Sequence, residues 1–178
     1  PDDVLTTLIY RWSFDDKSKN ITMSIQKGQS APDFSLFNTD KNKVALADYK
    51  GKNLVILFFP LAFTGVCTTE LCSVRDNLNV YSGLNAEVVG ISVDSLFALD
   101  KFKQEQQYNF PLLSDFNKTT AKAYGAFYDE FVLDMHGVAK RAAFVVDKEG
   151  VVQYAEVLES AGDLPNFDAI KETLSGLN

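Results

Sequence analysis

The chain has 178 residues, 46% of them hydrophobic and 23% charged, which suits one soluble domain with a single substantial core. Its formal net charge of −7 disfavours nucleic acids and anionic membranes as partners, because both require clustered Lys and Arg. No apolar run approaches the roughly 18 to 20 residues that cross a bilayer, and no basic start followed by an apolar block opens the chain, so we expect a cytoplasmic protein.

One domain is predicted over residues 23–178, preceded by a segment of different character. Residues 1–22 are richer in turn and charge signals than in any clean apolar period. They are an N-terminal extension of uncertain status, a packed hairpin or an expression artefact, and the sequence does not decide among these. No internal repeat or low-complexity tract divides the rest of the chain.

The first clear elements are a strand and a helix. The continuous apolar run over residues 53–59 predicts a strand buried on both faces of a sheet. The apolar period then changes, and a helix is predicted over residues 68–81, with Cys67, Leu71 and Val74 on its apolar stripe. The cysteine therefore lies where the strand gives way to the helix.

The next elements repeat this order. Residues 86–93 predict a second buried strand, and residues 95–107 predict a second helix with Asp94 or Ser95 as its cap. Two strands, each followed by a helix, make a unit in which the strands run parallel. The sheet is therefore at least partly parallel.

The last third of the chain predicts a hairpin and a closing helix. Strands over residues 142–146 and 151–157 flank a turn at 147–150, where Gly150 is available for a left-handed conformation. A helix over residues 166–174 follows a Leu-Pro pair that marks its start. A parallel unit, a hairpin and a last helix predict a thioredoxin-like α/β fold, with a central mixed sheet flanked by helices.

The counts of cysteine and histidine limit the chemistry. The chain has two cysteines and one histidine, too few for the four ligands of a structural zinc site. Four residues separate Cys67 from Cys72, whereas two separate the cysteines of a thioredoxin-type site. His136 lies in a segment, Asp134–Gly137, that we interpret as a solvent-exposed turn, so Cys-His catalysis is not favoured.

The segment 60–67 carries the strongest functional signal. Pro60, Thr64 and Cys67 follow the predicted strand and precede the predicted helix. A cysteine in the first turn of a helix is stabilised as a thiolate by the helix dipole and by backbone N–H groups that have no partner within the helix. Cys67 could instead be an inert core cysteine, since free cysteine is often buried, but the complete spacing favours a reactive thiol.

This spacing resembles the Pro-x-x-x-Thr-x-x-Cys signature of the peroxiredoxins, the AhpC/TSA superfamily. The resemblance extends to Ala31–Phe34, Phe110–Asp115 and Arg141–Asp147, so it covers roughly residues 25–174. Within the family, the surroundings of the cysteine look closest to the alkyl hydroperoxide reductase E type. The spacing of Cys67 and Cys72 also resembles the bacterioferritin comigratory protein type.

The resemblance implies roles for the other site residues. Arg141 would be the charge partner of Cys67, because a guanidinium can hold both the sulfur and a peroxide oxygen. The Thr64 hydroxyl could bridge the thiolate and the peroxide, and the Val66 and Cys67 N–H groups would face the peroxide oxygens. Pro60 would shield the sulfur from water. Glu70, one turn after Cys67, could orient Arg141 or simply favour the helix dipole.

Cys72 leaves the recovery step open. On a regular helix, five residues turn the side chain by about 500°, which is 140° beyond a full turn, and advance it by about 7.5 Å, so the two sulfurs cannot bond without unwinding. The turn takes Cys72 off the apolar stripe towards a flank, available to solvent or another subunit. Either Cys72 resolves the oxidised Cys67 after local opening, or an external thiol completes the cycle, and we favour one-cysteine cycling or a facultative bond.

The expected function is a thiol-dependent peroxidase that reduces hydrogen peroxide and organic hydroperoxides through a Cys67 sulfenic acid. The resemblance implies no cofactor and no metal, a thiol reductant such as thioredoxin, a glutaredoxin-like protein or a small thiol, and a homodimer. Two alternatives belong to other functional classes. A peroxide-sensing relay or holdase chaperone would use the same cysteine with slow turnover, and a non-catalytic binding module would not use it.

Overall fold

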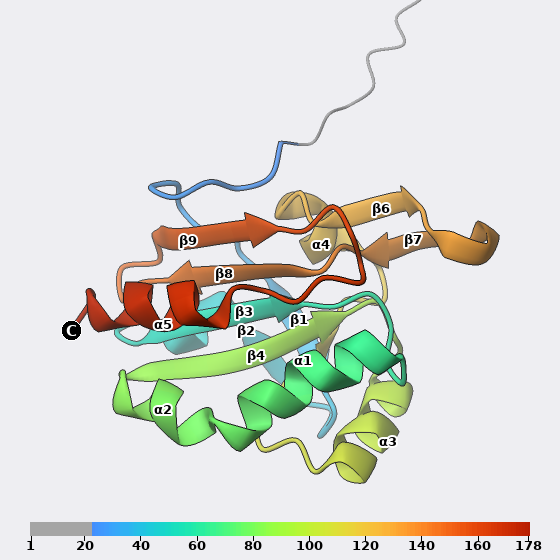
Figure 1. Ribbon diagram of the computed structural model, residues 1–178, viewed down its shortest axis with the longest axis horizontal. Coiled ribbons are helices and arrows are strands. Elements are labelled where there is room, and N and C mark those ends of the chain that lie inside the picture. The colour runs from blue at the N-terminus through green and yellow to red at the C-terminus, as the bar shows by residue number, and fades with distance from the viewer. Residues whose placement is uncertain (1–22) are drawn as a thin grey trace, which may run out of the picture.

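The computed structural model describes residues 23–178, and the expectations for residues 1–22 lie outside this part of the chain. Within residues 23–178, seven strands form one sheet in the order β2-β1-β5-β4-β3-β8-β9, and two more form a separate ribbon, β6-β7 (Figure 1). Strands β3, β4 and β5 run parallel, whereas β8 is antiparallel to β3. The predicted thioredoxin-like fold with a mixed sheet is therefore confirmed.

The predicted strands and helices are present with small shifts. The strands among them are β3 (Asn53–Phe58), β4 (Ala86–Ser92), β8 (Ala142–Val146) and β9 (Val152–Val157). The helices are α1 (Gly65–Asp76), α3 (Leu96–Gln106) and α5 (Phe167–Ser175). Ser95 caps α3 by accepting a hydrogen bond from the Ala98 N–H, at 3.2 Å. Gly150 has the expected left-handed conformation in the hairpin turn, with φ of 87°.

The helix predicted over residues 68–81 was wrong at both ends. It begins earlier, at Gly65, and it breaks at Asn77, after which a second helix, α2 (Leu78–Gly83), continues the chain. The Asn77 side chain donates to the Ser73 carbonyl at 2.8 Å. An asparagine that bonds its own backbone in this way competes with regular helical hydrogen bonds.

Several short elements were not predicted. They are β1 (Ser35–Asn38), β2 (Lys43–Ala45), β5 (Leu112–Ser114), β6 (Phe127–Glu130), β7 (His136–Ala139), α4 (Thr119–Ala123) and two 3-10 turns, η1 (Leu46–Tyr49) and η2 (Val132–Asp134). The prediction for His136 was partly wrong, because this residue begins β7 and does not lie in a turn. Its side chain is solvent-exposed, as expected.

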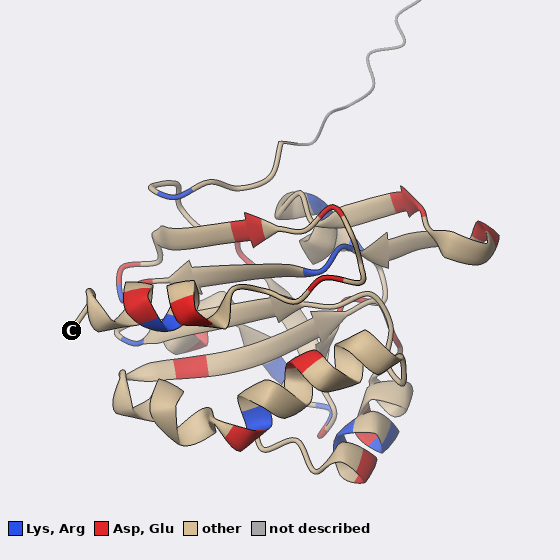
Figure 2. Ribbon diagram, in the orientation of Figure 1, with Lys and Arg blue, Asp and Glu red and all other residues tan. Residues whose placement is uncertain are grey.

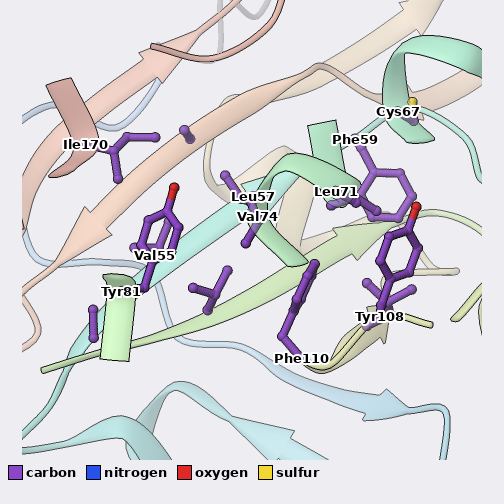
Figure 3. Close-up of a cluster of buried hydrophobic side chains, with 14 of the residues drawn as sticks. Val55, Leu57, Phe59, Cys67, Leu71, Val74, Tyr81, Tyr108, Phe110 and Ile170 are labelled. Atoms are coloured by element: carbon purple, nitrogen blue, oxygen red, sulfur yellow. The ribbon is translucent and has the colours of Figure 1, made fainter. Parts of the chain in front are cut away.

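Two apolar cores lie on the two faces of the sheet. One packs the sheet against α1, α2, α3 and α5, and the other packs it against α4 and the segment around Phe34. Cys67 belongs to the first core and lies at one end of it, beyond Phe59 and Leu71 (Figure 3). The site is thus built at the edge of a rigid, close-packed layer.

Basic and acidic residues both occur along the described residues 23–178. Lys and Arg are scattered among Asp and Glu over the described ribbon (Figure 2). No helix within residues 23–178 is both long and apolar enough to span a membrane.

Candidate active site

The loop between β3 and α1 delivers the cysteine to the start of a helix. Pro60 follows β3 and is buried, and Thr64 is the N-cap residue of α1. The Thr64 hydroxyl donates to the Leu61 carbonyl at 2.9 Å and does not cap the helix. The first hydrogen bond of α1 runs from the Thr68 N–H to the Thr64 carbonyl, at 2.9 Å.

The start of α1 consequently leaves backbone donors without partners. Among residues 23–178, no protein group accepts from the N–H groups of Gly65, Val66 and Cys67. Such groups carry the positive end of the helix dipole. They therefore form a site that suits an anionic sulfur or oxygen.

Cys67 contacts a buried arginine. Its Sγ atom accepts a hydrogen bond from Arg141 Nη2 at 3.3 Å, and both side chains are only 1% exposed. Arg141 comes immediately before β8, the strand that pairs with β3, so the sheet brings it beside the cysteine. A guanidinium this close to the sulfur brings a full positive charge and hydrogen-bond donors to it.

Two further groups fix the guanidinium. Arg141 Nη1 forms a buried ion pair with Glu70 Oε2, one turn along α1 from Cys67. On its other side, the Ala161 carbonyl accepts from Nη2 at 2.8 Å and from Nε at 3.3 Å. The donors of Arg141 are therefore divided between a carboxylate, a carbonyl and the sulfur, so the side chain has one orientation.

Glu70 is a carboxyl group with no exposed surface. Burial raises the pKa of Glu70 to about 7, while the charge and hydrogen bond of Arg141 oppose this rise. Within the described residues, its Oε1 atom has no hydrogen-bond partner. In the Glu70–Arg141 pair, the attraction between opposite charges is thus offset by a large cost of removing both groups from water, as is usual for buried ion pairs.

Cys72 has different surroundings. It is half-buried, and its Sγ atom lies 3.7 Å from Gln106 Oε1 and 3.9 Å from the Tyr108 hydroxyl. Burial raises the pKa of Tyr108 well above its usual range, so this neighbour stays uncharged at neutral pH. Arg75 is paired with Asp76 at 2.8 Å. The expected position off the apolar stripe is correct, but Cys72 packs against the end of α3 and the segment after it.

The structure brings together some of the predicted site residues and not others. Arg141 contacts both Cys67 and Glu70, and Pro60 is buried within the β3–α1 loop. No hydrogen bond joins Thr64 to Cys67 within residues 23–178, because the Thr64 hydroxyl proton is given to Leu61. The part of the chain that the structure describes shows no cluster of three His, Cys, Asp or Glu side chains suited to a metal ion.

Sequence reasoning missed two contributors to the site. Ala161 acts through its backbone carbonyl, for which residue type gives no signal. Asp94 accepts a hydrogen bond from the Ala62 N–H at 2.8 Å, although the sequence placed Asp94 only as a possible cap of α3. A carboxylate that follows a parallel strand lies at the same sheet edge as the site, and this was the available signal.

The fold and the buried Cys-Arg pair define a thioredoxin-fold protein with a candidate redox cysteine. The AhpC/TSA family model matches residues 27–155, and the chain belongs to this family. It is 38% identical over 161 residues to the chloroplastic 2-Cys peroxiredoxin BAS1 of Spinacia oleracea, covering 84% of this chain and 58% of that protein. The chain thus spans little more than half the length of this relative.

Two other matches cover their counterparts more fully. The chain is 39% identical over 146 residues to the chloroplastic 2-cysteine peroxiredoxin of Chattonella marina var. antiqua, covering 76% of this chain and 72% of that protein. Its structure resembles that of peroxidoxin BcpB from Mycobacterium tuberculosis, with a TM-score of 0.77 and 28% identity over 86% of this chain and 99% of that one.

Proposed function

We propose that this protein is a thiol-dependent peroxidase that reduces hydrogen peroxide and organic hydroperoxides through a sulfenic acid on Cys67. The contact between Arg141 Nη2 and Cys67 Sγ, at 3.3 Å in a buried site, carries the proposal. A buried cysteine that served only to fill the core would not require a buried cation beside it. Membership of the AhpC/TSA family supports the same activity.

The reaction is a two-electron oxidation of the sulfur. The Cys67 thiolate attacks one peroxide oxygen, an S–O bond forms and the O–O bond breaks. The bonding electron pair leaves with the second oxygen, which takes up a proton and departs as water or an alcohol. Sulfur is oxidised to the sulfenic acid and the peroxide is reduced, so no metal, haem or flavin is needed.

The surrounding groups stabilise the charges of this step. Arg141 can donate to the sulfur and to the attacked oxygen, and the free N–H groups of Val66 and Cys67 can donate to the peroxide, as in an oxyanion hole. The Thr64 hydroxyl oxygen keeps lone pairs that can accept from a peroxide proton. Pro60 has no N–H and limits the access of water.

Two thiol equivalents must then reduce the sulfenic acid. We propose that an external thiol supplies at least one, from thioredoxin, a glutaredoxin-like protein or a small thiol. Cys72 shares one unbroken helix with Cys67, so a bond between them requires the first turns of α1 to unwind. A one-cysteine cycle, or a facultative Cys67–Cys72 bond, fits this arrangement best.

We further propose that the protein acts as a homodimer. Four phenylalanines are exposed to an unusual degree, and three of them border one hollow near the sheet edge that carries the site: Phe37, Phe97 and Phe116, with Phe63 as the fourth. Large exposed apolar side chains mark surfaces that proteins cover. Sedimentation velocity would test this, and a monomer at micromolar concentration would contradict it.

Steady-state peroxide consumption with dithiothreitol or thioredoxin tests the activity. The proposal expects many turnovers per Cys67 and none in Cys67→Ser. A single stoichiometric oxidation of Cys67, with no further turnover in the presence of any of these thiols, would instead indicate the sensing relay or the holdase.

A further inference from the structure

The loop that leads to the cysteine contains a strained residue. Phe63, directly before the N-cap residue Thr64, has a left-handed backbone with φ of 63°. A bulky side chain rarely adopts this conformation, which persists only where surrounding contacts enforce it. The Phe63 ring contacts Phe102 on α3 with a centroid distance of 4.9 Å, but the residue is 52% exposed.

The backbone on the other side of Phe63 is held by a carboxylate. The Ala62 N–H donates to Asp94 Oδ2 at 2.8 Å, and this hydrogen bond joins residues 32 positions apart. Charge-assisted hydrogen bonds of this kind are stronger than neutral ones. Asp94 therefore ties the β3–α1 loop to the segment that follows β4.

Asp94 is itself fixed by two strand ends. The buried Ser92 hydroxyl donates to Asp94 Oδ2 at 2.7 Å and accepts from the Asp94 N–H at 3.2 Å. The Ser114 hydroxyl, at the end of β5, donates to the Asp94 carbonyl at 2.6 Å. Ser92 therefore orients the Asp94 carboxylate, and Ser114 holds the Asp94 backbone.

We propose that Asp94 is a positioning residue of the peroxide site, holding the Ala62 N–H so that Phe63 stays left-handed and Thr64 stays at the start of α1. Within residues 23–178, no hydrogen bond joins Asp94 to Cys67, so Asp94 acts through the loop. This role rests on the proposed peroxidase function. Without the hydrogen bond, Phe63 can relax, and Thr64 and the first N–H groups of α1 shift relative to the Cys67 sulfur.

The test compares Asp94→Ala and Asp94→Asn with the native protein and with Asp147→Ala. Asp147 is a matched control, because it accepts three hydrogen bonds in the β8–β9 turn at the opposite edge of the sheet. Asp94→Ala should lower the second-order rate constant for Cys67 oxidation by about 10- to 100-fold. Asp94→Asn should recover part of the loss, and Asp147→Ala should leave the rate within about twofold.

A second variant tests the route through Phe63. Asparagine adopts left-handed backbone more readily than phenylalanine, so Asp94→Ala should cost less in a Phe63→Asn background than in the native one. An equal loss in both backgrounds would overturn the proposed route. A native rate in Asp94→Ala would overturn the role altogether.

Amide hydrogen exchange separates this inference from the peroxidase proposal. The Ala62 amide should be protected in the native protein and should exchange at least tenfold faster in Asp94→Ala. Unchanged exchange would show that Asp94 does not hold the loop. A native protein that protects this amide but does not react with peroxide would overturn the peroxidase function and leave the loop anchor intact.

Discussion

Cys67 and Cys72 lie on one helix, five residues apart, in different surroundings. Cys67 is sealed from solvent and contacts the guanidinium of Arg141, at the end of α1 where backbone N–H groups are free. Cys72 is half-buried beside Gln106 and Tyr108, more than one turn further from the positive end of the helix dipole. The nearby Arg75 guanidinium is paired with Asp76, and within residues 23–178 no hydrogen bond joins it to the Cys72 sulfur as Arg141 is joined to Cys67. The chemistry of a thiol is therefore set by what the fold places around it.

The largest expected effect is the loss of the Cys67 thiol. Cys67→Ser should reduce peroxide consumption to that of the reductant alone, because a serine hydroxyl does not ionise at neutral pH. A coupled assay with thioredoxin or dithiothreitol measures this. If Cys67→Ser retained a tenth of the native rate, Cys67 would not be the main thiol that reacts with peroxide.

Removing the guanidinium should have the next largest effect. Arg141→Met should lower the second-order rate constant with hydrogen peroxide by about 10²- to 10³-fold, as for the loss of one key donor at other sites. Arg141→Lys should lose less, since the charge remains without the planar fork. Rapid-mixing kinetics provide the measurement.

Loss of Arg141 also leaves Glu70 buried without its partner, which destabilises the fold. The control is therefore Glu70→Gln/Arg141→Met, which removes both charges. If this double variant reacted with peroxide at the native rate, the cation would not explain the difference between Cys67 and Cys72.

Glu70 predicts a dependence of stability on pH. The pKa of Glu70 is raised from 4.5 to about 7 in the folded protein. The stability that the protonated carboxyl contributes is therefore fully present below pH 4.5, and it is lost as the pH rises to about 7. Glu70→Gln removes this loss. The free energy of unfolding of the variant, relative to the native protein, should rise by on the order of 2 kcal/mol between pH 5 and pH 8.

Urea unfolding at the two pH values measures this change. If the difference in free energy of unfolding between the native protein and Glu70→Gln were the same at both pH values, Arg141 would fully compensate for the burial of the carboxylate. If the free energy of unfolding of Glu70→Gln fell relative to that of the native protein as the pH rose, the predicted direction would be wrong.

The smallest effect is expected at the second cysteine. Cys72→Ser should change the rate constant for oxidation of Cys67 by less than about twofold, because within residues 23–178 Cys72 shares no hydrogen-bond partner with Cys67 or Arg141. The same rapid-mixing assay detects a larger change. A tenfold loss would mean that Cys72 takes part in the first step.

Long elements with a strong apolar period were predictable from the sequence. Strands β3 and β8 are almost entirely apolar, and β4 is apolar between Glu87 and Ser92. Helices α3 and α5 have caps and turns that the sequence displays. Strands such as β2 and β5, with three residues each, are too short to show a period. The break at Asn77 depends on one side chain that bonds its own helix, which competes with an otherwise helical pattern.

The site was predictable only in part, for a similar reason. The spacing of Pro60, Thr64 and Cys67 is local, so the sequence displays it. Arg141 is 74 residues away from Cys67, and its partnership was expected only from the family resemblance. The role of the Ala161 carbonyl depends on a backbone group, so residue type gives no signal for it. The position of Asp94 after β4 indicated the correct sheet edge, but its bond to the Ala62 N–H is formed only by folding.

The central claim is that Cys67, and not Cys72, is the thiol that peroxide oxidises. One equivalent of hydrogen peroxide followed by a sulfenic acid reagent such as dimedone, with peptide mass spectrometry, locates the oxidised sulfur. We predict an adduct on Cys67 in the native protein and in Cys72→Ser, and its loss in Arg141→Met at the same peroxide dose. An adduct on Cys72 in the presence of an unmodified Cys67 would contradict the account.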